Sequence, residues 1–457
     1  MPRLREILAI GLVALAAATQ IPYPGWNAGA HYALVRSLVD GTPRIDHHLN
    51  QSGDIAYVDG HYYAAKSPGL AFISIPSYLV FDALGKVPAT YVTGQGPPGA
   101  RQVAERAIWQ VNLTVIAAFF LLLLLLRSAV DRFYRGAGTA VALLLGLGTM
   151  LLPFATAYFS HVLSATLGFA AFCVLLVERG RGSRKLLFAA GALAGLSVFT
   201  ELPTAIVGAC LGGYVITDAP RLRRGAEYAA GVAVGVLPLG LYNWWAFGSP
   251  FRSGYNDAVK VLGKTGHDVL GANGQGFFGL THPHFHAAVD LLFSKIGLFV
   301  MTPVTLVAVL GLVLLHRAGH RRESILIAAM VAVFLLYNAS YYLPFGGATP
   351  GPRFLVPLLP FLALPLAAVY RRWPLVALAA GLYSAFWMVA ATIAGPLLPP
   401  DTSPTLWIRE IAHGHEVMGS MLGKGTAGAI AFLVPAVLAV VLVLWEEEAA
   451  PESAVTR

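Results

Sequence analysis

Residues 40–76 read DGTPRIDHHLNQSGDIAYVDGHYYAAKSPGLAFISIP. This stretch directly follows the first apolar segment of the chain and precedes every other one. Because the remainder of the chain is mostly hydrocarbon, we expect this polar stretch to lie outside the membrane and to carry the chemistry of the protein. It gathers carboxylates, a lysine and histidines, namely Asp40, Asp46, Asp54, Asp59, Lys66, His47, His48 and His61.

The composition excludes an ordinary soluble domain. Of the 457 residues, 57% are hydrophobic and 12% are charged, whereas soluble chains carry about 25% charged residues. Several apolar runs approach the ~20 residues that span a bilayer, so the sequence predicts an all-α polytopic membrane protein. The net charge of +8 is spread over short loops and does not indicate nucleic acid. Cys173 and Cys210 both lie in apolar segments, which gives no support to a disulfide framework.

Hydrophobic periodicity predicts about twelve transmembrane helices in one domain over residues 1–445. The start, MPRLREILAIGLVALAAATQIP, could alternatively be a cleaved signal peptide, and either interpretation leaves the next loop outside. The expected spans are 8–24, 108–126, 137–157, 162–177, 186–200, 203–217, 226–246, 289–315, 324–343, 354–370, 374–395 and 426–445.

The distribution of basic residues predicts the orientation of the helices. Positive residues favour the cytoplasmic side, so both termini and the acidic tail 446–457 are expected to be cytoplasmic, in the plasma (inner) membrane. The predicted outer loops are 25–107, which should form short interfacial helices, 247–288 and 396–425. Basic residues precede the first span and follow every second one: Arg3, Arg5, Arg127, Arg132, Arg135, Arg179, Arg181, Arg184, Lys185, Arg221, Arg223, Arg224, Arg317, Arg321, Arg322, Arg371 and Arg372.

Two cations in the predicted outer loops are candidates for binding phosphate. Lys66 lies in AAKSPG and Arg353 lies in GGATPGPRF, each just before an apolar run. Gly/Pro-rich turns leave backbone N–H groups available, and a neighbouring cation completes a phosphate cradle. The alternative is that each side chain snorkels or pairs with a loop carboxylate.

Three further residues are candidate walls of a site. Glu201 in FTELP is a carboxylate at membrane depth, which usually faces a polar cavity, although it could instead cap a helix beside Pro203. His161 in FSH lies at the outer end of the fourth span, on the same predicted face, although it could instead be an ordinary packing residue. Tyr255 in FGSPFRSGY could contact a sugar or lipid headgroup, or belong to an interfacial aromatic belt.

The run His282-Pro283-His284-Phe285-His286 has the HxH spacing of some metal sites. Apart from Asp290, no nearby carboxylate or cysteine completes a ligand set. We therefore expect this run to be the start of an interfacial helix, and we assign no metal and no cofactor.

With these residues in place, the chain resembles the GT-C superfamily of integral-membrane glycosyltransferases, close to the protein mannosyltransferase and aminoarabinose transferase families. The resemblance covers most of the chain and predicts a GT-C-like fold with a large first extracytoplasmic loop. It rests on GDIAYVDGHYYAAKSPG (53–69), FSH (159–161), FTELP (199–203), FGSPFRSGY (247–255) and GGATPGPRFLVPLLP (346–360).

The resemblance implies a polyprenyl-phosphate-linked sugar donor and transfer on the extracytoplasmic face, with an acidic residue of the first outer loop as base. Soon after the first span, where that carboxylate is often found, this chain has Trp26-Asn27. Asp40-Gly41 and Asp59-Gly60 are typical of turns, so the base is expected to be Asp46 or Asp54. His61 and Tyr63, in the same motif, are expected to line the sugar site.

The chemistry of the loop favours the same class of enzyme. Displacing a lipid phosphate from an anomeric carbon requires a base for the acceptor hydroxyl and cations for the phosphate. Asp54, Lys66 and Arg353 supply those groups, and direct displacement would invert the anomeric centre. Together with this chemistry, the resemblance implies a hexosyl- or pentosyltransferase acting on a glycan, lipid or protein acceptor. The alternatives are that the aspartates only form turns, and that the chain is a twelve-span transporter, a lipid-linked sugar flippase or an assembly scaffold.

Overall fold

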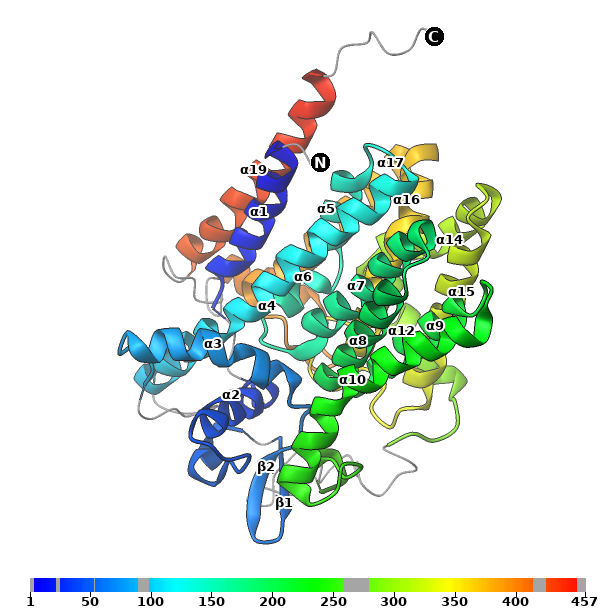
Figure 1. The fold of residues 1–457 in the computed structure, drawn as a ribbon. Helices are drawn as coiled ribbons and strands as arrows, with labels where there is room; N and C mark the ends of the chain where they lie inside the picture. Colours follow the sequence, from blue (N-terminus) through cyan, green and yellow to red (C-terminus); the bar gives the residue numbers. More distant parts are fainter. Residues whose placement is uncertain are drawn as a thin grey trace, which may run out of the picture.

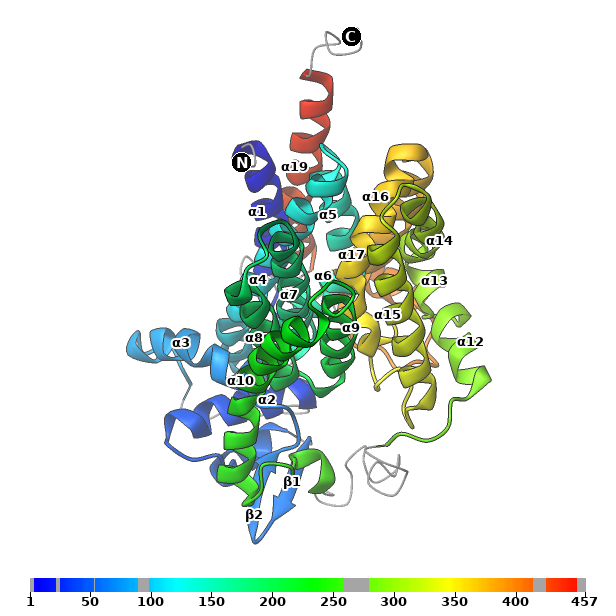
Figure 2. The ribbon, with the colours of Figure 1, turned by 45° about the vertical axis from the view of Figure 1, so that its right-hand side comes forward.

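The computed structural model describes residues 4–21, 25–52, 54–88, 98–257, 279–413 and 425–449. Within these ranges the chain is almost entirely helical, and its strands form a short antiparallel hairpin. Figure 1 and Figure 2 show a bundle of long helices with the hairpin projecting from one end. The fold is therefore that of a polytopic helical membrane protein, as the composition predicts.

The α-helices before the second long loop are α1 (Leu4–Thr19), α2 (Trp26–Val39), α3 (Gly69–Ala83), α4 (Pro98–Phe133), α5 (Gly138–Gly148), α6 (Leu151–Ala155), α7 (Ser160–Arg181), α8 (Arg184–Thr200), α9 (Ala205–Val215) and α10 (Arg221–Phe247). After it come α12 (Phe285–Phe293), α13 (Leu298–Met301), α14 (Pro303–Arg317), α15 (Arg321–Ser340), α16 (Ala363–Arg372), α17 (Pro374–Ala394), α18 (Thr405–His413) and α19 (Thr426–Ala449). The 3-10 helices are η1 (Asp46–Gln51), η2 (Leu202–Thr204), η3 (Gly254–Asp257) and η5 (Arg353–Leu362), and the strands are β1 (Ile55–Val58) and β2 (His61–Ala64).

All twelve predicted apolar segments contain helix, but they are not equally long. In the described part of the chain, seven helices are long and apolar enough to cross a membrane, or eight if a bent pair counts as one span. That pair joins α12 and α13 to α14 with a bend of 94°. The other four predicted spans are short or broken: α1, α8 and α9 have 16, 17 and 11 residues, and 137–157 divides into α5 and α6.

The described part of the first long loop lies at one end of the bundle. It contains the expected short helices α2 and α3, and also the hairpin, whose register pairs Ile55 with Ala64 and Val58 with His61. Both residues of its turn have a positive φ, 49° at Asp59 and 87° at Gly60, which confirms the predicted turn. The start of α1 and the end of α19 lie at the opposite end of the molecule (Figure 1).

Helices α8 and α10 pack with their backbones in direct contact. A Cβ atom added at any of four glycines would lie between 2.0 and 2.4 Å from a carbonyl oxygen of the facing helix. Small residues allow such close approach of helices inside a membrane. We call this contact the glycine seam, and it is formed by Gly191, Gly195, Gly231 and Gly235. The glycine seam fixes α10 against α8. The last residue of α10 contacts the hairpin, and the C-terminus of α8 leads into Glu201.

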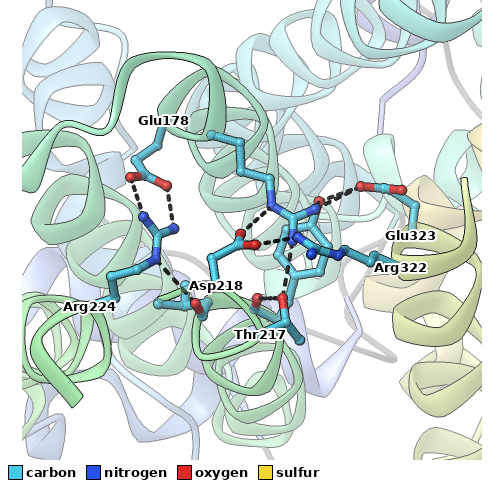
Figure 3. Close-up of polar contacts among 9 residues, drawn as sticks. Glu178, Thr217, Asp218, Arg224, Arg322 and Glu323 are labelled. Carbon is cyan, nitrogen blue, oxygen red and sulfur yellow. Dashed lines mark hydrogen bonds and ion pairs between the residues drawn. The ribbon is translucent and has the colours of Figure 1, made fainter. Parts of the chain in front are cut away.

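At the other end of these helices the predicted basic loops are held by an ion-pair network (Figure 3). Arg224 of α10 donates two hydrogen bonds to Glu178 of α7, at 2.8 and 2.6 Å, and the Glu178 side chain is fully buried. Arg179 bonds Asp218 at 3.0 Å and Glu323 of α15 at 3.0 Å. The network therefore ties α7, α10, α15 and the segment after α9 together on the side away from the hairpin.

Candidate active site

The hairpin brings Asp54 and Lys66 together. Asp54 directly precedes β1, and Lys66 follows β2 by two residues, so antiparallel pairing places them side by side. The backbone N–H of Ala65 donates to the Asp54 carbonyl at 3.0 Å, and the Lys66 ammonium lies 3.1 Å from the Asp54 carboxylate. The two side chains are only 10% and 15% exposed. A predicted phosphate-binding lysine and a predicted base thus form a nearly buried ion pair.

The turn after Lys66 packs against the end of α8. A Cβ atom at Gly69 would lie 2.7 Å from the Phe199 carbonyl oxygen and from the Thr200 Cα, so only glycine fits there. The chain leaves α8 at Thr200 and continues into Glu201. The KSPG turn and the TELP turn, which are more than 130 residues apart in the sequence, are therefore neighbours in the fold.

Glu201 is bound by two residues of α7. The His161 Nδ1 lies 2.6 Å from one carboxylate oxygen of Glu201, and Ser164 Oγ donates to the other oxygen at 2.8 Å. Glu201 precedes η2 but makes no side-chain capping bond there, so its carboxylate turns toward His161 instead. The His161 side chain is 5% exposed, and its Nε2 is buried without a hydrogen-bond partner.

Arg353 begins η5 and is enclosed by aromatic rings. Its guanidinium carbon lies 5.6 Å from the centre of the Phe159 ring and 5.3 Å from that of Phe354. A Cβ at Gly346, where φ is +81°, would be 2.4 Å from Arg353 Nε, so the GGATPG loop folds tightly over this side chain. Among the described residues, no carboxylate forms an ion pair with Arg353, and its Nε has no hydrogen-bond partner.

Tyr255 shows that these charged groups converge. The Lys66 ammonium lies 5.7 Å from the centre of the Tyr255 ring. Burial raises the pKa of the Tyr255 phenol, the carboxylates of Glu201 and Asp54 raise it further, and Arg353 opposes them. The Tyr255 phenol is therefore within electrostatic reach of all three groups, so the charged residues of three separate chain segments share one region near the hairpin.

Two residues that sequence reasoning missed belong to the same region. His31 of α2 is buried, and burial together with Lys66 lowers the pKa of His31 to about 3, while Asp54 acts in the opposite direction. Burial raises the pKa of Tyr342, Asp54 raises it further and Arg353 opposes this. The only sequence signals were a histidine within the apolar run AGAHYALV and a tyrosine pair just before GGATPGPRF.

The other predicted loop residues have different partners. Asp46 accepts a hydrogen bond from the Tyr62 backbone N–H at 2.8 Å, and its second oxygen lies 3.0 Å from His61 Nδ1. Asp46 thus joins the start of η1 to the start of β2. Tyr63 is buried and packs on Phe247 of α10 with ring centres 5.1 Å apart. These contacts stabilise the hairpin, and of the two candidate bases it is Asp54 that is paired with Lys66.

The histidine run 282–286 starts a helix, as predicted, because His284 is the residue that precedes α12. In the described ranges, no group of three or more His, Cys, Asp or Glu side chains is arranged to hold a metal ion. His282 and His284 pack with ring centres 4.2 Å apart. These imidazoles therefore need another explanation, which is considered below.

Neither a protein-family model nor a curated protein matches the sequence. Solved structures do match. ArnT from Cupriavidus metallidurans, bound to undecaprenyl phosphate, aligns with a TM-score of 0.58 and 15% identity over 97% of this chain and 72% of that one. Its apo form gives a TM-score of 0.53. The Archaeoglobus fulgidus oligosaccharyltransferase in the apo form gives 0.51 and 12% identity, over 98% of this chain and 58% of that one.

These neighbours are GT-C glycosyltransferases, so the chain has the GT-C fold, which confirms the predicted fold class. At 15% and 12% identity the likeness concerns the fold alone. The roles of individual residues must be argued from the contacts of this chain itself.

Proposed function

We propose that this GT-C-fold protein transfers a sugar from a polyprenyl-phosphate donor to an acceptor hydroxyl at the hairpin end of the molecule. The observation that carries the proposal is the nearly buried Asp54–Lys66 pair, 3.1 Å apart, beside Arg353, whose Nε has no hydrogen-bond partner. A base and two cations in one low-dielectric region match what displacement of a lipid phosphate requires.

In this proposal Lys66 and Arg353 bind the phosphate of the donor. The phosphodiester carries a negative charge before transfer, and the departing prenyl phosphate carries more. Charge-assisted contacts to cations strengthen as that charge develops, and this lowers the barrier. Arg353 is suited to this role because two aromatic rings pack against its guanidinium and its Nε has no hydrogen-bond partner.

Asp54 is the proposed base. It takes the proton of the acceptor hydroxyl, and the acceptor oxygen attacks the anomeric carbon. The bond from that carbon to the phosphate oxygen breaks, and its electron pair leaves with the prenyl phosphate. A single displacement of this kind inverts the anomeric centre. Asp54 must first lose its contact with Lys66, and the arriving phosphate provides the competing anion that draws the ammonium away.

His161, Glu201 and Tyr255 are the proposed wall of the donor-sugar site. Glu201 holds His161 through Nδ1, which leaves the buried Nε2 available to a ligand. Because the Glu201 carboxylate has two hydrogen-bonding partners, we assign it the positioning of His161 and not the role of base. Asp46, His61 and Tyr63 support the hairpin in this scheme.

Two observations support the wider setting. A fold neighbour, ArnT, has undecaprenyl phosphate bound, which favours a polyprenyl carrier. The start of α1, the end of α19 and the arginine-rich network lie away from the hairpin, and basic residues favour the cytoplasm. We therefore propose a plasma-membrane protein with cytoplasmic termini and an extracytoplasmic site. The acceptor is a glycan, lipid or protein hydroxyl.

The test uses the full chain in proteoliposomes with polyprenyl phosphates carrying radiolabelled mannose, arabinose or glucose, and membrane extract as the source of acceptor. Wild-type protein should release label from one donor, and Asp54→Asn should not. Transfer by Asp54→Asn at the wild-type rate would contradict the role of Asp54. Label that crosses the bilayer while still on its lipid would establish a flippase instead.

A further inference from the structure

A hollow of about 520 Å³ opens next to the charged region. Its volume falls within the range of about 300–1,000 Å³ that is usual for small-ligand pockets. The start of α12 and the segment after α15 form its walls. The polar and aromatic side chains that line it include Thr281, His284, His286, Asp290, Tyr341 and Tyr342.

The two walls are joined through their backbones. The Thr281 N–H donates to the Ser340 carbonyl at 2.8 Å, and the His284 N–H donates to the Ala339 carbonyl at 2.9 Å. The Tyr342 N–H donates to the Gly279 carbonyl, in the segment before α12, at 2.9 Å. Although nearly 60 residues separate the walls in sequence, they form one pre-organised frame, so a ligand would not need to order them.

The lining has the chemistry of a carbohydrate site. Tyr341 and Tyr342 place their ring centres 4.7 Å apart and offer aromatic surface to the C–H face of a sugar. The imidazoles of His284 and His286 and the carboxylate of Asp290 offer hydrogen-bond donors and acceptors to its hydroxyls. A few placed polar groups beside aromatic rings are typical of sites that orient a small ligand.

The tyrosine pair is shared between the hollow and the proposed donor site. The Tyr341 ring centre lies 5.3 Å from that of Phe354, and Phe354 in turn packs on Arg353. Tyr342 is within electrostatic reach of Asp54 and Arg353. A molecule in the hollow therefore lies one aromatic layer from the groups that would carry out transfer.

Helix α12 gives the hollow a lipid-facing border. Phe285, Val289 and Phe293 recur at four-residue spacing, and their side chains are 82%, 37% and 58% exposed. His286 and Asp290 lie on the adjoining face, toward the hollow. A helix with an apolar stripe beside a polar one is typical of the membrane interface, so the hollow is accessible to a molecule with an apolar tail and a polar head.

We propose that this hollow binds the sugar head of an amphiphilic acceptor. The inference rests on the proposed glycosyl transfer and identifies the acceptor as a glycolipid-like molecule. The donor phosphate is held on the Arg353 side of the tyrosine pair, so the acceptor approaches from the α12 side. Asp290 and His286 bind hydroxyls of its sugar other than the one that Asp54 deprotonates.

The test is saturation-transfer difference NMR on the full chain in nanodiscs, with methyl glycosides of glucose, galactose, mannose, N-acetylglucosamine and arabinose as probes. At least one glycoside should bind the wild type. Asp290→Ala and His286→Ala should each weaken that binding about tenfold, which is the effect of losing one hydrogen bond to a charged or polar group. His413→Ala is the matched control, since His413 is an exposed histidine of α18 that does not line the hollow.

Stabilisation by undecaprenyl phosphate is measured on the same samples. It should be unchanged in all three variants, which also shows that they are folded. Absence of any glycoside signal, or equal binding by the Asp290 and His286 variants, would overturn the proposal. Displacement of the glycoside by undecaprenyl phosphate carrying a sugar, but not by undecaprenyl phosphate alone, would assign the hollow to the donor sugar and overturn it as well. If the wild type does not bind undecaprenyl phosphate at all, the proposed donor is refuted instead.

Discussion

Replacing either member of the Asp54–Lys66 pair should block transfer, but only one replacement should weaken binding of the donor lipid. Two unit charges 3.1 Å apart attract by about 5 kcal/mol at an effective dielectric constant of about 20. Desolvation offsets much of this attraction, but removing one partner of a buried pair still costs about 3–5 kcal/mol. Lys66→Met should therefore destabilise the fold, because it removes the ammonium from beside a carboxylate that is 15% exposed.

The effect on the lipid separates the two residues. Lys66→Met removes one charged contact to the phosphate, which is worth about 1.5–3 kcal/mol, so undecaprenyl phosphate should bind about 10- to 150-fold more weakly. Asp54→Asn removes the anion that competes for Lys66, so the lipid should bind at least as tightly as to the wild type. Transfer should be lost in both variants.

Affinity is measured by titrating undecaprenyl phosphate into nanodisc-embedded protein and following its thermal stability. Lys86→Met is the matched control, because Lys86 is an exposed lysine of the same long loop, and it should bind the lipid like the wild type. If Asp54→Asn weakens lipid binding as much as Lys66→Met does, the pair only holds the hairpin, and competition by phosphate is the wrong explanation.

Three further predictions concern the fold and the arginine site. Glu178→Gln should lower the free energy of unfolding in SDS by about 3–5 kcal/mol because its arginine partner stays buried, whereas the exposed pair at Glu227 should contribute less than about 1 kcal/mol. Burial lowers the pKa of His31 to about 3, so the unfolded chain binds the proton more tightly and stability falls as the pH drops below about 6.5, by up to about 1.4 kcal/mol per unit. His31→Gln should flatten that pH profile, and an unchanged slope would contradict it. Gly346→Ala should weaken undecaprenyl phosphate binding because its Cβ would displace the arginine beneath it. Gly347→Ala carries the same positive-φ strain without that contact and should not.

The sequence predicted the helices because the length of an apolar run and the charge of the loop beside it are local properties of the sequence. It did not predict which spans would be short or broken. Those depend on packing that a one-dimensional pattern does not contain, as where the chain turns at Thr149 between α5 and α6. The hairpin had a local signal, since Asp59-Gly60 is a preferred hairpin turn. The turn was predicted, but the flanking strands were only four residues long.

For the candidate site, the sequence predicted which groups carry charge but not which groups meet. Lys66, Glu201, His161 and Arg353 stand out because polar groups are rare in this chain. The contacts among them join residues that are distant in the sequence. His161 and Glu201, for example, are 40 residues apart, and no local rule predicts such a pair. Asp46 and Asp54 were indistinguishable by sequence, because only the hairpin register decides which of them faces Lys66.

The glycine seam has a consequence for how variants of this protein should be interpreted. Helix α8 of the seam leads directly into Glu201, which binds His161. Helix α10 ends at Phe247, which packs against the hairpin next to Lys66. A methyl group added at Gly195 or Gly235 would push the two helices apart and so separate these two sets of side chains. In a random mutagenesis screen, lesions buried deep in the bilayer should therefore score as enzymatic defects while the protein still reaches the membrane in normal amounts.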